Sequence, residues 1–195
     1  VMTLAQKQRE QLARYLEWKQ AQGETEGPQR LSTMLSDIQR PRLEWLRQNV
    51  TGTVLEVGCG WGFVLAWVNG QAGVEINPAL VELAQILSPE REFKTADARA
   101  LPYEAESFDT VMLPEVLEHM EFHEVGGAVH EALRVARRRV LITVPDGSTE
   151  TTEATCFKHR YLMDDEHLDW LLKMLPPCRL DRMPPFLYIR VDMRD

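Results

Sequence analysis

Short apolar runs alternate with helix-like stretches along most of this chain. Five runs have the length and β-branched content of buried strands: residues 53–57, 72–76, 92–96, 108–113 and 139–144. The spacing of apolar positions predicts helices at 61–68, 78–87, 115–136 and 164–174. Because parallel neighbouring strands need a crossover connection, this alternation predicts a parallel sheet with right-handed crossovers.

The two ends of the chain depart from this alternation. Residues 178–193 contain two extended runs separated only by Pro184-Pro185, which leaves no room for a helical crossover. We therefore expect an antiparallel hairpin at one edge of the sheet. Near the N-terminus, residues 4–20 and 31–48 have helical spacing, with a turn-rich linker at 23–29 and an interruption at Pro41. These features predict a helical extension or lid, residues 1–50, ahead of a main domain, residues 51–195.

The elements together predict an α/β protein. Its core is a doubly wound, mostly parallel seven-stranded sheet with helices on both faces and an antiparallel last strand. A chain of 195 residues with 44% hydrophobic and 27% charged residues is ordinary for one globular domain. No apolar run is long enough to span a membrane, and a signal-peptide core is not recognisable. The three cysteines are far apart and lack metal-ligand spacing, so we expect reduced thiols in a cytoplasmic protein.

The formal charge of -8 is unevenly distributed. Residues 1–50 hold eight Lys and Arg against six Asp and Glu, whereas residues 51–195 hold fourteen against twenty-four. An acidic main domain repels a phosphate backbone, so nucleic acid is a disfavoured partner. The sequence leaves the oligomeric state open.

The segment VLEVGCGWG, residues 54–62, leads from a predicted strand into glycines at 58, 60 and 62. Glycine lets the backbone turn sharply and lets a ligand approach closely. The loop lacks the Lys and Ser/Thr of a phosphate-binding P-loop, and its third glycine comes one residue early for a dinucleotide fingerprint. ATP hydrolysis and hydride transfer are therefore disfavoured.

Acidic residues end the next two predicted strands. Glu75 lies about twenty residues beyond the first strand, where an acidic side chain can accept both hydroxyls of a ribose. Asp97 follows the third strand and could accept a hydrogen bond from the exocyclic amine of a base. We expect no Lys or Arg nearby for a phosphate. The pattern describes a site for a nucleoside cofactor without phosphate groups.

With these features, residues 53–145 resemble the core of the class I S-adenosylmethionine-dependent methyltransferases. VLEVGCGWG is similar to the first motif of that family, VEINP to the second, TADARALP to the third and FDTVMLPEVLEHM to the fourth. The resemblance implies S-adenosyl-L-methionine as cofactor and S-adenosyl-L-homocysteine as product. It implies a cofactor site around Glu56, Gly58, Cys59, Gly60 and Gly62 (methionine part), Glu75 and Ile76 (ribose and adenine), Asp97 and Ala98 (adenine amine) and Leu113 (beside the sulfonium). Cys59 itself fits a small buried filler.

Methyl transfer needs an aligned, desolvated acceptor and sometimes a base that removes its proton. The candidate catalytic side chains are Glu115 and His119, after the fourth strand, and His159, after the fifth; Glu118 is a further candidate. His119 and His159 could instead orient the acceptor or be structural. Tyr15, Trp18 and Trp45 could line a lid over the acceptor or simply pack the extension onto the sheet.

The expected function is methyl transfer, most simply O-methylation, to a small-molecule or carrier- or sugar-linked acceptor. An alternative places Glu115, Glu118 and His119 on one helix face. With His159, this resembles the divalent-metal site of small-RNA 2′-O-methyltransferases, and the function would then be RNA-end methylation. A third alternative is a non-catalytic S-adenosylmethionine-binding partner or regulatory protein. We expect no metal, because the EVLEH stretch is common in metal-free relatives.

Overall fold

The computed structural model describes residues 39–147 and 163–193, together with residues 10, 13–15, 17, 20 and 21. Trp18, the linker at 23–29 and His159 lie outside the described residues. Among the helices that the structure describes, none is long and apolar enough to cross a membrane.

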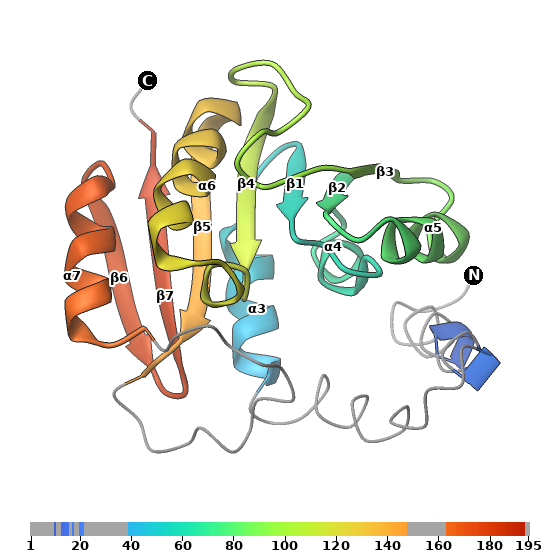
Figure 1. The fold of residues 1–195 in the computed structure, drawn as a ribbon, viewed down its shortest axis with the longest axis horizontal. Helices are drawn as coiled ribbons and strands as arrows, with labels where there is room; N and C mark the ends of the chain where they lie inside the picture. The colour runs from blue at the N-terminus through green and yellow to red at the C-terminus, as the bar shows by residue number, and fades with distance from the viewer. Residues whose placement is uncertain are drawn as a thin grey trace.

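The core is a seven-stranded sheet in the order β3-β2-β1-β4-β5-β7-β6 (Figure 1). Five strands run parallel, and β7 pairs antiparallel with both β5 and β6, as the sequence predicts for the hairpin. The strand order reverses between β1 and β4, which is where such sheets bind ligands. The bounds are β1 Val54–Val57, β2 Ala72–Glu75, β3 Glu92–Thr95, β4 Phe108–Pro114, β5 Ala136–Pro145, β6 Cys178–Met183 and β7 Phe186–Asp192.

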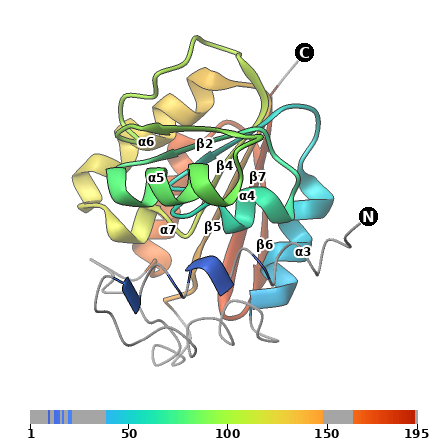
Figure 2. The same ribbon diagram turned by 90° about the vertical axis from the view of Figure 1, so that its right-hand side faces the viewer.

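Helices cover both faces of the sheet. One core cluster packs apolar residues of α6 and α7 against the strands, and a second packs residues of α3, α4 and α5 against the opposite face. In Figure 2, α3 and α6 accordingly lie on opposite sides of the strands. The helices are α3 Gln39–Asn49, α4 Phe63–Trp67, α5 Pro78–Leu87, α6 Phe122–Val135 and α7 Asp165–Met174, with a short 3-10 turn, η1, at Leu117–His119.

The helix predicted over 115–136 is wrong in its first part. Strand β4 continues to Pro114, and Glu115 has a φ of 56°, a left-handed conformation that no α-helix contains. The chain then makes η1 and an extended Glu121, whose side chain forms a reciprocal capping box with Glu124. Helix α6 therefore starts seven residues later than expected, and it runs into β5 without an intervening turn.

Helix α3 is built into the core. Leu43 and Leu46 are fully buried, in one cluster with Val54 of β1 and Leu141 of β5. Pro41 does not interrupt the helix as predicted, because α3 runs continuously from Gln39 to Asn49.

Candidate functional site

The three glycines of the loop after β1 all have left-handed backbones, with φ of 70°, 52° and 82° at Gly58, Gly60 and Gly62. The loop is folded back on itself, because the Gly62 amide donates to the Cys59 carbonyl at 2.8 Å. It is tied to β2 by the Cys59 amide, which donates to the Val74 carbonyl at 2.9 Å. The left-handed backbone of the turn is by itself a sufficient reason for glycine at all three positions, independent of any ligand.

The surroundings of these glycines differ. A Cβ at Gly58 would lie 2.6 Å from Val116 Cγ2, and one at Gly62 would lie 2.9 Å from the Phe93 ring. A Cβ at Gly60 would meet nothing within 4 Å. Gly60 is thus the position where the loop backbone faces open space that a ligand can enter.

The Cys59 side chain is part of the core and does not line the loop. Its side chain is buried, and its Sγ lies against Gly73 of β2, where an added Cβ would be 2.7 Å away. Burial raises the pKa of this thiol. Only the backbone of Cys59 is left to line the loop, in agreement with its interpretation as a small filler.

Glu75 links the end of β2 to the glycine loop. One carboxylate oxygen accepts from the Gly60 amide and the other from the Asn77 amide, both at 3.0 Å. The neighbouring Ile76 is 67% exposed, unusually so for a large aliphatic side chain. A hydrogen-bond acceptor and an exposed apolar surface therefore adjoin at this strand end.

Asp97 follows β3 as predicted, but the expectation that no cation lies nearby is wrong. Arg99 donates to the Asp97 carboxylate from its backbone amide at 2.8 Å and from Nε at 2.9 Å, and it also pairs with Glu124 of α6. The hydrogen bonds from Arg99 lower the pKa of Asp97. Arg99 is paired with two carboxylates, so its charge is already balanced and is not available to bind a phosphate. Its effect is to keep Asp97 ionised. Ala98, between the two, is partly exposed.

The residues after β4 lie against the glycine loop through Val116 and Gly58. The Leu113 side chain is fully buried in the α6-side core, so only its backbone can contact a ligand. Glu115 is partly exposed, and its Oε1 accepts a hydrogen bond from the Thr143 hydroxyl of β5 at 3.1 Å. Burial raises the pKa of Glu115.

Glu118 and His119 point to different environments. Glu118 is 1% exposed, whereas His119, the next residue, is exposed. Within the described part of the chain, neither carboxylate oxygen of Glu118 has a hydrogen-bond partner, nor has Oε2 of Glu56, which is equally buried. Desolvation raises the pKa of both carboxyl groups well above the ordinary value. Buried polar atoms are normally hydrogen-bonded, so these orphaned acceptors call for a physical explanation.

Arg42 is the site residue that the sequence reasoning missed. Its guanidinium is buried, lies 5.5 Å above the Phe186 ring and donates through Nε to Gln39 at 2.8 Å. Its positive charge acts on Glu56, Glu115 and Glu118. One signal was available: Arg42 lies one turn before Leu46, so a charge occupies the buried stripe of α3.

The metal arrangement that the RNA-end alternative requires is not assembled by the described residues. Since the segment is a 3-10 turn, Glu118 and His119 do not share a helix face with Glu115. In the ranges that the structure describes, no group of three His, Cys, Asp or Glu side chains could hold a metal ion. His159 lies outside these ranges.

The two aromatic residues of the N-terminal extension that the structure describes, Tyr15 and Trp45, both pack onto the main domain. Tyr15 is buried and stacks on Trp61 of the glycine loop, with ring centroids 4.8 Å apart. Trp45 lies against Tyr188 of β7 at 5.1 Å and so packs α3 onto the sheet.

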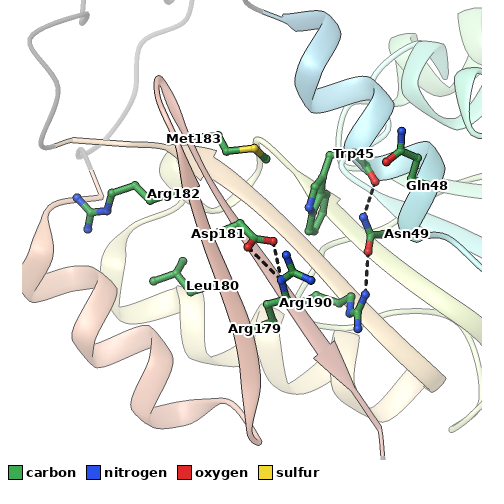
Figure 3. Close-up of a pocket in the computed structure, with 9 residues that line it drawn as sticks. All are labelled: Trp45, Gln48, Asn49, Arg179, Leu180, Asp181, Arg182, Met183 and Arg190. Atoms are coloured by element: carbon green, nitrogen blue, oxygen red, sulfur yellow. Dashed lines mark hydrogen bonds and ion pairs between the residues drawn. The ribbon is translucent and has the colours of Figure 1, made fainter.

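A cavity of about 540 Å³ lies between α3 and the β6–β7 hairpin (Figure 3). Trp45, Arg179 and Arg190 line it, together with residues of both strands. The two arginines are already engaged, Arg179 by Asp181 at 3.0 Å and Arg190 by Asp192 at 2.9 Å. Among the described residues, none of the predicted catalytic or cofactor side chains lines this cavity, and these side chains gather instead at the glycine loop.

Comparison with known proteins bears on this site. Residues 55–144 match the family described as methyltransferase domain. The chain is 29% identical over 121 residues to the methyltransferase GfsG of Streptomyces halstedii. That match takes in 53% of this chain and 44% of GfsG, so the chain spans less than half the length of this curated relative.

Solved structures share the fold. The PH0226 protein of Pyrococcus horikoshii OT3 is 20% identical with a TM-score of 0.66, covering 82% of this chain and 92% of that one. A SAM-dependent methyltransferase of Thermotoga maritima is 18% identical with a TM-score of 0.67, covering 78% and 87%. The magnesium protoporphyrin IX methyltransferase of Synechocystis PCC 6803, solved with bound SAM, is 18% identical with a TM-score of 0.57, covering 80% and 77%.

Proposed function

We propose that this protein is a class I methyltransferase that binds S-adenosylmethionine and methylates a small molecule, because residues 55–144 match the methyltransferase-domain family and the sheet has its ligand-binding strand reversal beside the glycine loop. The observation that carries the proposal is the open space at Gly60, bordered by Glu75 and Ile76. In this family the cofactor supplies a methyl group that is already activated as a sulfonium.

The described residues fit such a cofactor. Glu75 would hold the ribose hydroxyls, and the exposed Ile76 would cover the adenine. Asp97, kept ionised by Arg99, would accept from the adenine amine, with the Ala98 backbone beside it. The orphaned oxygen of Glu56 needs a hydrogen-bond donor, which the ammonium group of the methionine part would supply. Gly58, Gly60, Gly62 and the backbone of Leu113 would border the methionine part and sulfonium.

For the acceptor, we propose O-methylation of a small or carrier- or sugar-linked metabolite. The acidic main domain supports a small molecule over a nucleic acid. Glu115 supports an acceptor that must lose a proton, because it is a partly exposed carboxylate with a raised pKa after β4. His119 and His159 remain proposals as orienting or catalytic groups. A cytoplasmic location is proposed from the free thiols of Cys59 and Cys178.

Thermal unfolding with and without S-adenosylmethionine tests the proposal. We expect millimolar cofactor to raise the melting temperature of the wild-type protein. Gly60→Arg should abolish the rise, because its side chain fills the open space, and Asp97→Ala should weaken it. Ile86→Arg, at an exposed position on α5, is the matched control and should keep the full rise.

Two outcomes would count against the proposal. No rise in melting temperature with the wild-type protein would end the methyltransferase interpretation. A normal rise without methylation of any compound in a broad acceptor library would favour a cofactor-binding partner or regulatory protein.

A further inference from the structure

Two glutamates that follow β4 interact electrostatically, and one of them is buried. Glu115 is partly exposed at the end of the strand, and Glu118 is 1% exposed in η1. The negative charge of Glu115 raises the pKa of Glu118, after the larger effect of burial. Both oxygens of Glu118 lack a hydrogen-bond donor among the described residues. A buried carboxylate in this condition is costly in its ionised form.

Charged and titratable groups from four elements surround this pair. Arg42 of α3 acts on both glutamates, and Glu56 of β1 carries a further buried carboxyl group beside Arg42. From β7, Tyr188 is within electrostatic range of Arg42 and Glu115, and burial raises its pKa to about 12, so it is neutral. His119 follows Glu118 in η1 and is exposed. The positive charge of Arg42 thus acts on three carboxyl groups, two of which, Glu56 and Glu118, are buried.

The two glutamates differ in what they can accept. Glu115 accepts a hydrogen bond from the Thr143 hydroxyl, which favours its ionised form. Neither carboxylate oxygen of Glu118 has a side-chain donor among the described residues, and burial raises its pKa well above the ordinary value, which favours the protonated form. Burial and the charge of Glu115 both disfavour an ionised Glu118, so the proton is assigned to the carboxyl group that lacks a hydrogen-bond donor.

We propose that Glu118 and Arg42 are positioning residues that hold a single proton on the Glu115–Glu118 pair, so that Glu115 faces the acceptor as an ionised base. The role toward an acceptor rests on the proposed function. An ionised base at Glu115 implies that the methyl acceptor reacts through an O–H or N–H group. That proton passes to Glu115 as the nucleophile gains the methyl group, and the sulfonium becomes a neutral thioether.

The single proton can be measured without cofactor or acceptor. The slope of the free energy of unfolding against pH counts the protons that the folded state binds in excess of the unfolded state. Since the pKa of Glu118 is raised in the folded state, the stability it contributes is present at low pH and is lost as the pH rises through that pKa. Urea titrations between about pH 5 and pH 9 cover the range above the ordinary glutamate pKa of about 4.3.

Glu118→Gln is the decisive variant, because glutamine has the shape of a protonated glutamate and does not titrate. We expect the unfolding free energy of the wild-type protein to fall with pH more steeply than that of Glu118→Gln, by up to one proton. Glu82→Gln, an exposed glutamate on α5, makes the same chemical change and should follow the wild-type slope.

Arg42 is tested by Arg42→Met and Arg42→Lys. Without the cation, Glu115 loses the charge that favours its ionised form, so Arg42→Met should bind up to one further proton on folding. Arg42→Lys keeps the charge and should restore a slope near that of the wild-type protein. If Arg42→Met does not fold, Arg42→Lys and Glu118→Gln still decide.

Equal slopes for wild-type and Glu118→Gln would overturn the proposal, because both carboxyl groups would then be ionised. It would also be overturned if magnesium chloride alone stabilised the chelator-treated wild-type protein but not Glu118→Gln, since the pair would then bind a cation. A slope difference between wild-type and Glu118→Gln, with no rise in melting temperature on adding S-adenosylmethionine, would support the shared proton and refute the proposed function. A rise in melting temperature with equal slopes would support the proposed function and refute the shared proton.

Discussion

At the residue scale, the three glycines of one loop have two different physical roles. Gly58 and Gly62 leave room for neighbouring side chains, whereas Gly60 leaves room for nothing within the protein. Since all three share a left-handed backbone, the cost of that conformation is common to them. Substitutions by alanine therefore separate the space that the fold needs from the space that a ligand needs.

We expect Gly62→Ala to destabilise the protein by about 2–4 kcal/mol, from left-handed strain and from overpacking against Phe93. Gly60→Ala should cost only the strain, about 1–2 kcal/mol. In Gly60→Ala, the rise in melting temperature caused by S-adenosylmethionine should be reduced strongly, whereas the free energy of unfolding without ligand should fall only by this strain. Urea titration and thermal unfolding measure the two effects, and a larger stability loss at Gly60 than at Gly62 would contradict this assignment.

Asp109 gives a pH prediction of the opposite sign to Glu118. Its carboxylate accepts from the Thr53 amide at 2.9 Å and from Arg137 at 2.9 Å, and these bonds, that from Thr53 first, lower its pKa. Its contribution to stability is therefore present above the unfolded pKa of about 3.9 and is lost as the pH falls through the folded value.

Asp109→Asn should accordingly be less stable than the wild-type protein at pH 7, and the difference should shrink below about pH 4. Urea titrations at pH 3 to 7 measure it. Glu104→Gln, an exposed neighbour in the chain, is the control and should show no such convergence.

At the scale of elements, α3 belongs to the core although it precedes residues 55–144, which match the methyltransferase-domain family. We expect Leu46→Ala to cost about 2–5 kcal/mol, because Leu46 is fully buried against the sheet. Gln48→Ala, on the exposed side of the same helix, should change the stability by less than about 0.5 kcal/mol. Equal effects of the two substitutions in urea titrations would show that α3 is only an accessory lid.

Elements with local signals were predictable from the sequence. Helix α5 matches its predicted bounds of 78–87, because Asn77 caps it and Pro78 suits its first turn. The β6–β7 hairpin followed from its short connection. The start of α6 was not predictable from periodicity, because the apolar spacing continues through η1 while Glu115 adopts a left-handed backbone.

The same distinction applies to the candidate site. The glycine loop, Glu75 and Asp97 follow from their places at predicted strand ends. The charge of Arg42 on the glutamates does not, because it depends on where α3 packs against the sheet. The pairing of Arg99 with Glu124 likewise requires α6 to be in place, whereas its pairing with Asp97 is local.

At the scale of the whole molecule, the arginine-rich stretch 134–139 does not form a free basic surface. Arg134 pairs with Glu131, Arg137 and Arg138 with Asp109, and Arg139 with Asp192. These pairs lie on a chain with a formal charge of -8. The long-range field therefore opposes a polyanion.

We expect no binding of a labelled RNA duplex at 0.15 M salt, measured by fluorescence anisotropy, with magnesium or without it. A protein that binds RNA through phosphate contacts would instead show affinity that falls steeply with added salt. Tight, salt-sensitive binding would revive the alternative of RNA-end methylation.

The open space at Gly60 has a consequence for how this chain can diverge. A descendant that lost its ligand would still be selected for glycine at 58 and 62, because Val116 and Phe93 occupy the adjacent space. At position 60 the fold would exert only the weak preference of a left-handed turn, which asparagine or aspartate also tolerate. Among descendants of this chain, substitution at position 60 with glycine kept at 58 and 62 would therefore identify the lineages that have lost ligand binding but kept the fold.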